Sequence, residues 1–211
     1  MEFQYLGHAA VLLCHSRGTL LIDPYETPAF DGQFRYRPIT AQPDWVVATH
    51  AHSDHAAFGV VPAATVVEEG VAGPYEIARV ALWHDEYDGR RRGGRVDALE
   101  IRVDGLRVVH LGDVGCAPPA SAVARLRFAD VLFLPVGGFY TIGAAQAWEW
   151  SERLCARTVV PIHYRTTACS LPIRGVEGFL AWAGEWKPWI SGPFSVQTGL
   201  DRVVRIEPAN A

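Results

Sequence analysis

The sequence predicts a layered α/β fold with a functional site on the loops beyond its strand ends. Three observations lead to this prediction. Short apolar runs, such as residues 45–48 and 159–162, have the length and composition of buried strands. Polar residues follow these runs directly, and layered α/β folds commonly build their sites at such places. Helical spacing of apolar residues occurs in the second half, most clearly over residues 142–156.

The first half of the 211-residue chain alternates short strands with turns. An apolar strand over residues 20–22 ends at Asp23. A loop rich in proline and aromatic residues follows over residues 26–43, and it exceeds the usual length of a connection. We therefore expect this loop to fold over a cleft. A short helix is expected to begin near Asp54 and to end by Gly59.

The second half is predicted to contain a hairpin, three helices and a closing strand pair. Asp104-Gly105 is a strong hairpin signal between two apolar runs. No repeat, low-complexity segment or flexible linker interrupts the chain, so residues 1–211 are expected to form one domain. The expected elements are hairpin strands over 98–103 and from 107, helices over 118–128, 142–156 and 175–186, and paired strands over 194–197 and 202–206.

Residues 49–55 carry the most specific chemical signal in the chain. They read THAHSDH and place His50, His52, Asp54 and His55 within six residues, although the whole chain has only 8 histidines. Imidazole and carboxylate groups suit zinc, iron or manganese. Because His50 and His52 leave a strand end two residues apart, they project to the same side. A merely polar, His-rich loop is the weaker interpretation, because desolvated imidazoles need the partners that a metal supplies.

Four further residues are candidates to complete such a site, and two of them, Asp113 and His163, lie where a predicted strand ends. They are His84, His110, Asp113 and His163.

These motifs together resemble the metallo-β-lactamase superfamily of hydrolases. The resemblance rests on the H-x-H-x-D-H motif, the Gly-Asp strand end at Asp113 and the late strand-end His163, and it runs from about residue 3 to residue 206. Five further segments make the resemblance more specific, to a compact branch similar to L-ascorbate-6-phosphate lactonase and N-acyl-phosphatidylethanolamine phospholipase D. These segments are YLGHAA at 5–10, LLIDP at 20–24, WHD at 83–85, VGGFYTI at 136–142 and IHY at 162–164.

The resemblance implies an αββα four-layer sandwich, with helices on both outer faces and two metal ions at one edge of the sheets. It also implies how the ions are held. One would bind His50, His52 and a third histidine, and the other would bind Asp54, His55 and His163, with Asp113 bridging them.

His84 and His110 compete for the place of the third histidine. His110 lies three residues before Asp113 on one strand. This odd separation points their side chains to opposite faces, about 10 Å apart along the strand. We therefore prefer His84, in the loop before the hairpin, and interpret His110 as a histidine bonded to a neighbouring backbone group or to a site residue.

The expected chemistry is hydrolysis by a hydroxide that bridges two divalent ions. Zinc is the expected metal, with manganese or iron as alternatives, and it lowers the pKa of bound water from about 15.7 to about 7. Asp113 would set the separation of the ions, and Asp54 would also orient or deprotonate the attacking water. Asp23 fits a role in orienting a ligand imidazole, although a strand-end Asp in a turn is an equal alternative.

Other residues near these motifs have weaker interpretations. Tyr140 is a candidate donor to a developing oxyanion. His8 either lines the cleft or, more commonly for a lone histidine beside an apolar strand, is a satisfied core residue. Cys116 reads as a small buried hydrophobe, with an auxiliary ligand as the alternative. An arginine run reads first as a solvated loop and second as a site for a phosphate or carboxylate; its members are Arg90, Arg91, Arg92 and Arg95.

Composition excludes several classes of function. A net charge of −4 argues against a nucleic-acid-binding surface. No apolar stretch is long enough to span a bilayer, and the start does not read as a signal peptide. The 4 cysteines form neither a metal motif nor a disulfide framework, so a cytoplasmic location is expected. The sequence leaves open whether the chain forms a homo-oligomer.

The sequence thus favours a metal-dependent, zinc-type hydrolase. Its expected partner is a small or moderate-sized molecule, either a lactone, an ester, an amide or a phosphodiester. The alternative is a non-catalytic metal-binding sensor or assembly subunit on the same fold. Structural zinc sites are closed and often use cysteine, which makes this alternative the weaker one.

Overall fold

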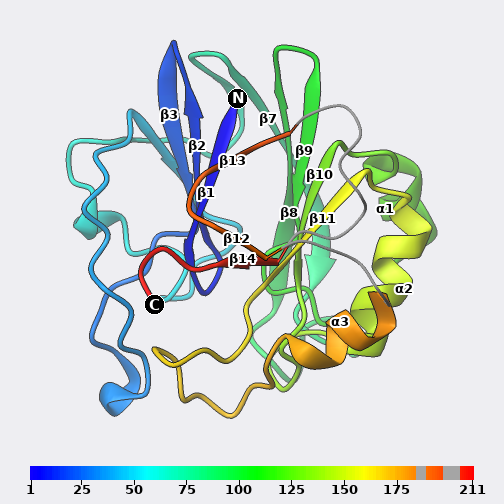
Figure 1. Cartoon of the computed structure of the whole chain (residues 1–211). Helices are drawn as coiled ribbons and strands as arrows, with labels where there is room; N and C mark the ends of the chain where they lie inside the picture. The colour runs from blue at the N-terminus through cyan, green and yellow to red at the C-terminus, as the bar shows by residue number, and fades with distance from the viewer. Residues whose placement is uncertain (184–188, 197–204) are drawn as a thin grey trace.

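Two six-stranded sheets pack face to face in the computed structural model, which describes residues 1–183, 189–196 and 205–211 (Figure 1). The first sheet has the order β13-β1-β2-β3-β4-β5 and the second the order β11-β10-β9-β8-β7-β6. The first contains β1 (Glu2–Gly7), β2 (Ala10–His15), β3 (Gly18–Ile22), β4 (Trp45–Val47), β5 (Thr65–Val66) and β13 (Phe194–Ser195). The second contains β6 (Gly70–Ala72), β7 (Tyr75–Trp83), β8 (Arg95–Val103), β9 (Leu106–His110), β10 (Val131–Pro135) and β11 (Thr158–Ile162).

Strand periodicity explains why the first sheet is buried on both faces. Successive side chains of a strand point to opposite faces. Along β3, Leu20 and Ile22 therefore enter the core between the sheets, whereas Leu21 enters a second core on the outer face. Val47 and Val46 of β4 divide between the two cores in the same way.

The second sheet confirms the hairpin that Asp104-Gly105 predicts. β8 and β9 pair antiparallel, with Val103 opposite Leu106 across this turn. β9, β10 and β11 then run parallel. All five residues of β10, VLFLP, are buried, as expected of a parallel strand that is covered on both faces.

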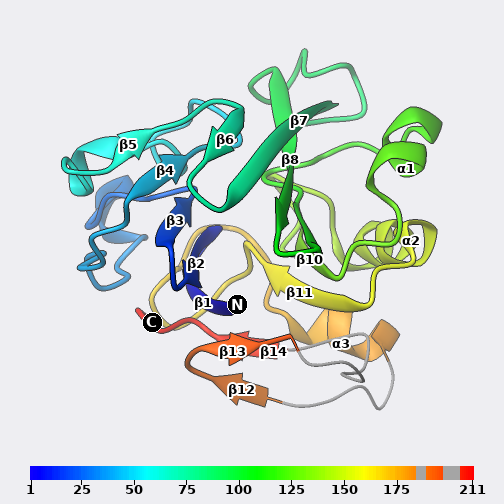
Figure 2. The same cartoon turned by 90° about the horizontal axis from the view of Figure 1, so that it is seen from above.

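The α-helices within the described residues lie against the outer face of the second sheet (Figures 1 and 2). They are α1 (Ala120–Leu126), α2 (Ala144–Leu154) and α3 (Glu177–Ala183), close to the helices predicted over 118–128, 142–156 and 175–186. α2 starts later than expected because the Ile142 carbonyl accepts the Gly138 N–H, and the first helical bond runs from the Ala147 N–H to the Gly143 carbonyl. Residues 184–186 lie outside the described residues.

Coil covers the outer face of the first sheet, where the resemblance implied helices. Tyr25, Phe34 and Tyr36 pack there against side chains of β2–β4, together with residues around Cys169. This coil contains one 3₁₀ turn, η1 (Phe30–Gly32). The α/β sandwich is thus confirmed, with its α-helices on one outer layer.

The short helix expected over 54–59 is absent from this part of the described chain. The N–H groups of His55 and Ala56 both donate to the His52 carbonyl, but the next N–H, of Ala57, donates to Pro24. This bond to another segment means that the chain makes a single helical turn and no helix. Only a 3₁₀ turn follows, η2 (Phe58–Val60).

The predicted pairing of 194–197 with 202–206 is wrong for the residues that the structure describes; residues 197 and 202–204 lie outside them. Phe194 instead pairs with Phe3 in an antiparallel β13–β1 ladder, where their rings stack at 5.2 Å between centroids. The burial of these rings against the core favours this partner. β14 (Arg205–Glu207) pairs in parallel with β12 (Trp189–Ser191) (Figure 2).

No helix within the described ranges combines the length and hydropathy that a bilayer-spanning segment needs.

Candidate metal centre

Polar residues within a few positions of strand ends converge at one edge of the two sheets. β1, β3 and β4 run in one direction within the first sheet, and β7, β9 and β11 share a direction within the second. Their carboxyl ends therefore deliver side chains to a common edge. The residues that follow are His8 after β1, Asp23 after β3, residues 49–55 after β4, His84 after β7, Asp113 after β9 and His163 after β11.

Three histidines form the first cluster. His50 Nε2 lies 3.0 Å from His52 Nδ1, and the ring centroid of His84 lies 4.5 Å from that of His50. One ring nitrogen of each falls within 4.8 Å of the others, which is the spacing of ligands around a single ion. The structure thus brings His84, rather than His110, to the pair from residues 49–55.

His110 is buried beside the cluster with both ring nitrogens engaged. Nε2 donates to the Ala9 carbonyl at 2.9 Å, and Nδ1 accepts from the Gly112 N–H at 3.1 Å. These two bonds define its neutral tautomer and use the lone pair that a metal would need. The interpretation of His110 as a histidine bonded to backbone agrees with this arrangement.

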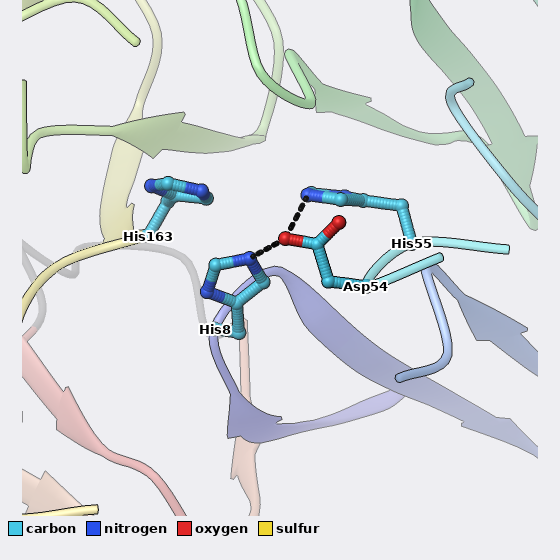
Figure 3. Close-up of side chains that lie close together, drawn as sticks. All are labelled: His8, Asp54, His55 and His163. Atoms are coloured by element: carbon cyan, nitrogen blue, oxygen red, sulfur yellow. Dashed lines mark hydrogen bonds and ion pairs between the residues drawn. The ribbon is translucent and has the colours of Figure 1, made fainter. Parts of the chain in front are cut away.

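The second cluster contains His8, Asp54, His55 and His163, which point toward one another in Figure 3. His8 Nε2 lies 3.1 Å from Asp54 Oδ2, and His55 Nε2 lies 3.9 Å from the same oxygen. The His8 and His163 rings are 4.1 Å apart between centroids.

Asp113 lies between the two clusters. Its Oδ2 is 3.2 Å from His55 Nε2 and 3.3 Å from His163 Nε2. It also forms a possible ligand group with His50 and His55. A carboxylate within reach of both clusters has the position that the resemblance implies for a bridging residue.

Asp23 organises the chain behind the clusters. It accepts the Thr49 N–H at 2.6 Å, the Thr49 hydroxyl at 2.8 Å and the His55 Nδ1–H at 2.9 Å. The last bond fixes the His55 tautomer and leaves the Nε2 lone pair free. Thr49 Oγ1 also lies 2.9 Å from His50 Nδ1, so Asp23 reaches a histidine of each cluster. Such outer carboxylates orient ligand imidazoles.

Burial keeps several of these imidazoles neutral. Desolvation lowers the pKa of His84 and of His8 to about 4, and that of His50 to about 3. The neutral form is the one that binds metals. Although burial alone would raise the pKa of Asp54, its contacts with His8 and His55 lower it, so the carboxylate is ionised.

Unusual backbone angles also gather here. His8, Asp23 and His163 have φ values of 54°, 49° and 51°. Side chains in the left-handed region cost free energy and concentrate at functional sites. Each of these three residues turns the chain at once after a strand and directs a polar side chain inward.

Several buried polar atoms of the site have no hydrogen-bond partner, and this bears on whether metals fit there. Among the described residues such atoms include His84 Nε2, His55 Nε2 and Asp113 Oδ1. Unpartnered buried groups of this kind are costly. Neutral imidazoles and ionised carboxylates are also the donors that zinc, iron and manganese accept. The residues present therefore fit bound divalent metals.

A cavity of about 660 Å³ opens directly over the clusters. Tyr140 lines it and is 39% exposed. Phe30 also lines it, which agrees with the expectation that the 26–43 loop folds over a cleft. Cys116 is not part of this lining; it is buried, and its carbonyl accepts from Trp150 Nε1.

His8 and Thr49 are the site residues that sequence reasoning undervalued. His8 was interpreted mainly as a core residue, yet it contacts Asp54 and His163. Its position directly after a strand, which it shares with Asp23 and His163, was the available signal. Thr49 has no metal-ligating side chain, so its residue type gives no signal of its bonds to Asp23.

Comparisons with known proteins agree with this geometry. The model of the Beta-lactamase superfamily domain matches residues 2–163. A UPF0173 metal-dependent hydrolase of Methanospirillum hungatei is 30% identical over 192 residues, covering 79% of this chain and 84% of the relative. One of Thermococcus onnurineus is 30% identical over 196 residues, covering 79% and 85%.

Solved structures share the fold. A crystal structure from Thermotoga maritima, described as a candidate Zn-dependent hydrolase of the metallo-beta-lactamase superfamily, superposes with a TM-score of 0.72 at 23% identity over 97% of both chains. An isothiocyanate hydrolase from Delia radicum gut bacteria superposes with a TM-score of 0.65 at 16% identity, covering 99% of this chain and 97% of the other. By its domain model, its relatives and its fold, this chain belongs to the beta-lactamase superfamily.

Proposed function

We propose that the protein is a metal-dependent hydrolase with a binuclear centre, most simply a zinc enzyme. The observation that carries this proposal is the meeting of two ligand clusters around one carboxylate, with buried donor atoms left unpartnered. The names of the metal-dependent hydrolase relatives support it. The proposed ligands are His50, His52 and His84 for one ion and Asp54, His55 and His163 for the other, with Asp113 shared.

Divalent metals in such a site supply a hydroxide-strength nucleophile from water at neutral pH and neutralise charge that develops on the substrate. The protein's part is to position the ligands. Asp23 holds His55 in the tautomer that presents Nε2. Burial holds His50 and His84 neutral, and Asp113 lies where it reaches both clusters.

Asp54 and Tyr140 are proposed to act on the reacting groups. Asp54 is held by His8 Nε2 and lines the cavity, so one of its oxygens can orient or accept the proton of the attacking water. Tyr140 lies on the cavity wall, where its hydroxyl can donate to the oxygen of a carbonyl or phosphoryl group that gains charge.

The substrate is proposed to be a small molecule with a lactone, ester, amide or phosphodiester bond. A cavity of about 660 Å³ is of the size that binds small ligands. A nucleic-acid substrate is disfavoured by the net charge of −4. We further propose that residues 1–211 form one domain, and that its free cysteines reflect a cytoplasmic, reducing environment.

Metal analysis of the purified protein, joined to a panel of lactones, esters, amides and phosphodiesters, tests the function. We expect bound divalent metal and turnover of at least one class. Asp113→Ala and His50→Ala should each abolish turnover and lower the metal content while leaving the fold intact. His15→Ala is the control, because His15 pairs with Asp104 outside the clusters.

Two results would contradict the proposal in different ways. Undiminished hydrolysis by a metal-free preparation would exclude the metal mechanism. Full metal loading without turnover of any class would favour the alternative, a non-catalytic metal-binding sensor or assembly subunit.

Tyr140→Phe tests the proposed oxyanion donor. Removing the hydroxyl should lower kcat by about 10²-fold, as the loss of an oxyanion donor does elsewhere, with little change in KM or metal content. Tyr87→Phe is a matched control, because Tyr87 is also exposed but does not line the cavity. Equal kcat values for the two variants would remove Tyr140 from the mechanism.

A further inference from the structure

The loop between β7 and β8 places two arginines on the cavity wall. Arg91 and Arg92 both line the cavity that opens over the metal clusters, together with His52 and His84. The sequence alone favoured a solvated loop for this arginine run. Two of its four members line the cavity instead.

The loop is built around a buried carboxylate. Asp85 accepts four backbone N–H groups, from Tyr87 at 2.7 Å, Gly89 at 3.0 Å, and Arg91 and Arg92 at 2.8 Å each. The backbone of both arginines is therefore held by a charged acceptor, which makes the loop a preorganised element.

The loop also packs directly on a proposed metal ligand. A Cβ at Gly93 would lie 2.7 Å from Cε1 and Nε2 of His52, so only glycine allows this approach. At the other side, Gln146 of α2 donates to Glu86 at 2.9 Å. Arg92 thus immediately precedes a residue in contact with the ligand cluster.

Both guanidinium groups rest on aromatic rings rather than on carboxylates. Arg91 lies 3.7 Å above the ring of Tyr87, and Arg92 lies 5.0 Å from the ring centroid of Phe139. Stacking of this kind holds a guanidinium in place and leaves its N–H edge free to bind an anion. Phe139 has a φ of 63°, a costly conformation for a side chain at a cavity mouth.

The neighbouring arginines differ in this respect. Arg90 pairs with Asp88 at 3.0 Å, and Arg95 pairs with Asp97 at 2.6 Å. Within the described part of the chain, Arg91 and Arg92 have no ion-pair partner, although the protein is acidic overall. Among the four arginines of this run, the two without an ion pair are the two that line the cavity. Apolar surface from Phe30, Phe139 and Leu171 completes its wall.

We propose that Arg91 and Arg92 form a subsite for a carboxylate or phosphate group of the substrate that lies away from the bond being cleaved. The substrate would then be an anion with an apolar portion between its charged end and its reacting end. This inference rests on the proposed hydrolase function for the reacting end only. A planar guanidinium pair suits either oxyanion, because it offers parallel N–H donors.

Matched esters test the subsite in the metal-loaded protein. The 4-nitrophenyl monoesters of glutaric, adipic and pimelic acid carry a free distal carboxylate. In the matched neutral substrates the 4-nitrophenyl ester is kept and this carboxylate is a methyl ester. We expect wild-type kcat/KM to favour the free acid of the best-fitting length. In Arg91→Gln/Arg92→Gln this preference should fall about 10- to 100-fold, because charge-assisted hydrogen bonds are lost.

Arg90→Gln is the control from the same loop, since Arg90 already has a partner and does not line the cavity. It should keep the wild-type preference, and metal content should be unchanged in all variants. Added salt should reduce the preference in the wild type, because the two arginines are exposed and their charges are screened. Equal preference in wild type and double variant would overturn the subsite while leaving the hydrolase function standing.

Calorimetric binding separates the subsite from catalysis if none of these esters is cleaved. The probes are phenylacetate, benzylphosphonate and neutral phenylacetamide, and comparison of the first two identifies the preferred oxyanion. Binding of either anion that weakens about 10-fold or more in the double variant, but not in Arg90→Gln, would support the subsite even if the hydrolase function fails. Anion binding that is absent, or equal in all three proteins, would overturn it.

Discussion

Gly93 shows how one backbone position controls a proposed metal ligand. A side chain there would press on the His52 ring, whereas Gly94 has open space around its Cβ position. Both residues have positive φ, at 96° and 85°, so both alanine variants carry a backbone cost of about 1–2 kcal/mol. Their difference isolates the contact with His52.

We expect Gly93→Ala to lose metal and hydrolytic activity, and Gly94→Ala to keep both apart from a small loss of stability. Metal content per chain and the thermal midpoint of each variant provide the measurement. If Gly93→Ala binds the wild-type amount of metal, the close approach of the loop to His52 has no role in the site.

Asp23 illustrates how a residue outside the ligand set shapes it. Asp23→Asn keeps the size of the side chain but replaces one carboxylate oxygen with an amide donor, which cannot accept the His55 Nδ1–H and the Thr49 hydroxyl. Metal affinity should fall about 10- to 100-fold, as for other outer-sphere partners. Competition with a chromogenic chelator measures this change.

Asp44 supplies the matched control for this substitution. It accepts the N–H and the hydroxyl of Thr19, much as Asp23 does for Thr49, but lies away from the clusters. Asp44→Asn should leave metal affinity unchanged. A similar loss in both variants would mean that the effect arises from general destabilisation.

At the scale of elements, a buried glutamate joins two strands to a helix. Glu100 of β8 is 1% exposed. Its oxygens lie 2.8 Å from Arg107 Nε of β9 and 2.8 Å from Arg125 Nε of α1, and Arg102 Nη2 lies at 2.9 Å. Burial alone would raise the pKa of Glu100, but the three guanidinium groups lower it below 4.5.

Because the pKa of Glu100 is lowered in the folded protein, its contribution to the free energy of unfolding depends on pH. A carboxyl group with a depressed pKa in the folded state contributes stability above its unfolded pKa, and that contribution is lost as pH falls through the folded pKa. Glu100→Gln should therefore lower the free energy of unfolding by about 2–4 kcal/mol at pH 7. The gap to wild type should shrink below about pH 4.5.

Urea unfolding of both proteins at pH 7 and at pH 3.5 measures the gap. Glu76→Gln is the control, because Glu76 is exposed on β7 opposite Arg102 and should change stability by less than about 0.5 kcal/mol. A gap that is the same at both pH values would show that Glu100 acts through packing rather than charge.

For the whole molecule, metal binding should be coupled to stability. The proposed ligands come from both sheets, so bound metal ties the two halves of the sandwich together. A ligand at about 100 times its Kd adds about 2.7 kcal/mol, and 1 kcal/mol shifts the Tm of a domain of this size by about 2–4 °C. Removal of the metals by a chelator should therefore lower Tm by about 5–10 °C.

Differential scanning calorimetry with and without chelator measures this coupling, and added zinc should reverse the loss. Asp113→Ala, which should bind metal weakly, is expected to show a much smaller shift with the same chelator. Identical Tm values for the wild type in both conditions would contradict a metal that bridges the sheets.

Much of the site was predictable because its parts are local. The histidine motif lies within seven residues, and Asp113 and His163 each follow an apolar run that reads as a strand. The choice of His84 over His110 also came from a local rule, the alternation of side chains along a strand. The structure agrees with it by engaging both nitrogens of His110 elsewhere.

The contributions of His8 and the partner of Phe194 were not predictable in this way. His8 reaches Asp54 across 46 residues of sequence, and Phe194 pairs with Phe3. Such pairings depend on which surfaces meet when the two sheets close, and no local pattern contains that information. The same holds for the turn at 54–57, which ends because Ala57 bonds to Pro24.

By itself, the sequence determined the strands with clear apolar runs, such as 20–22, 45–48 and 159–162, the hairpin at Asp104-Gly105 and the chemical types gathered at the strand ends, because periodicity and turn chemistry act over a few residues. The tertiary structure decided which of these groups meet, which arginines face the cavity and which outer face the helices cover. Those outcomes depend on contacts between distant segments, whose free energies are gained only when the whole core packs.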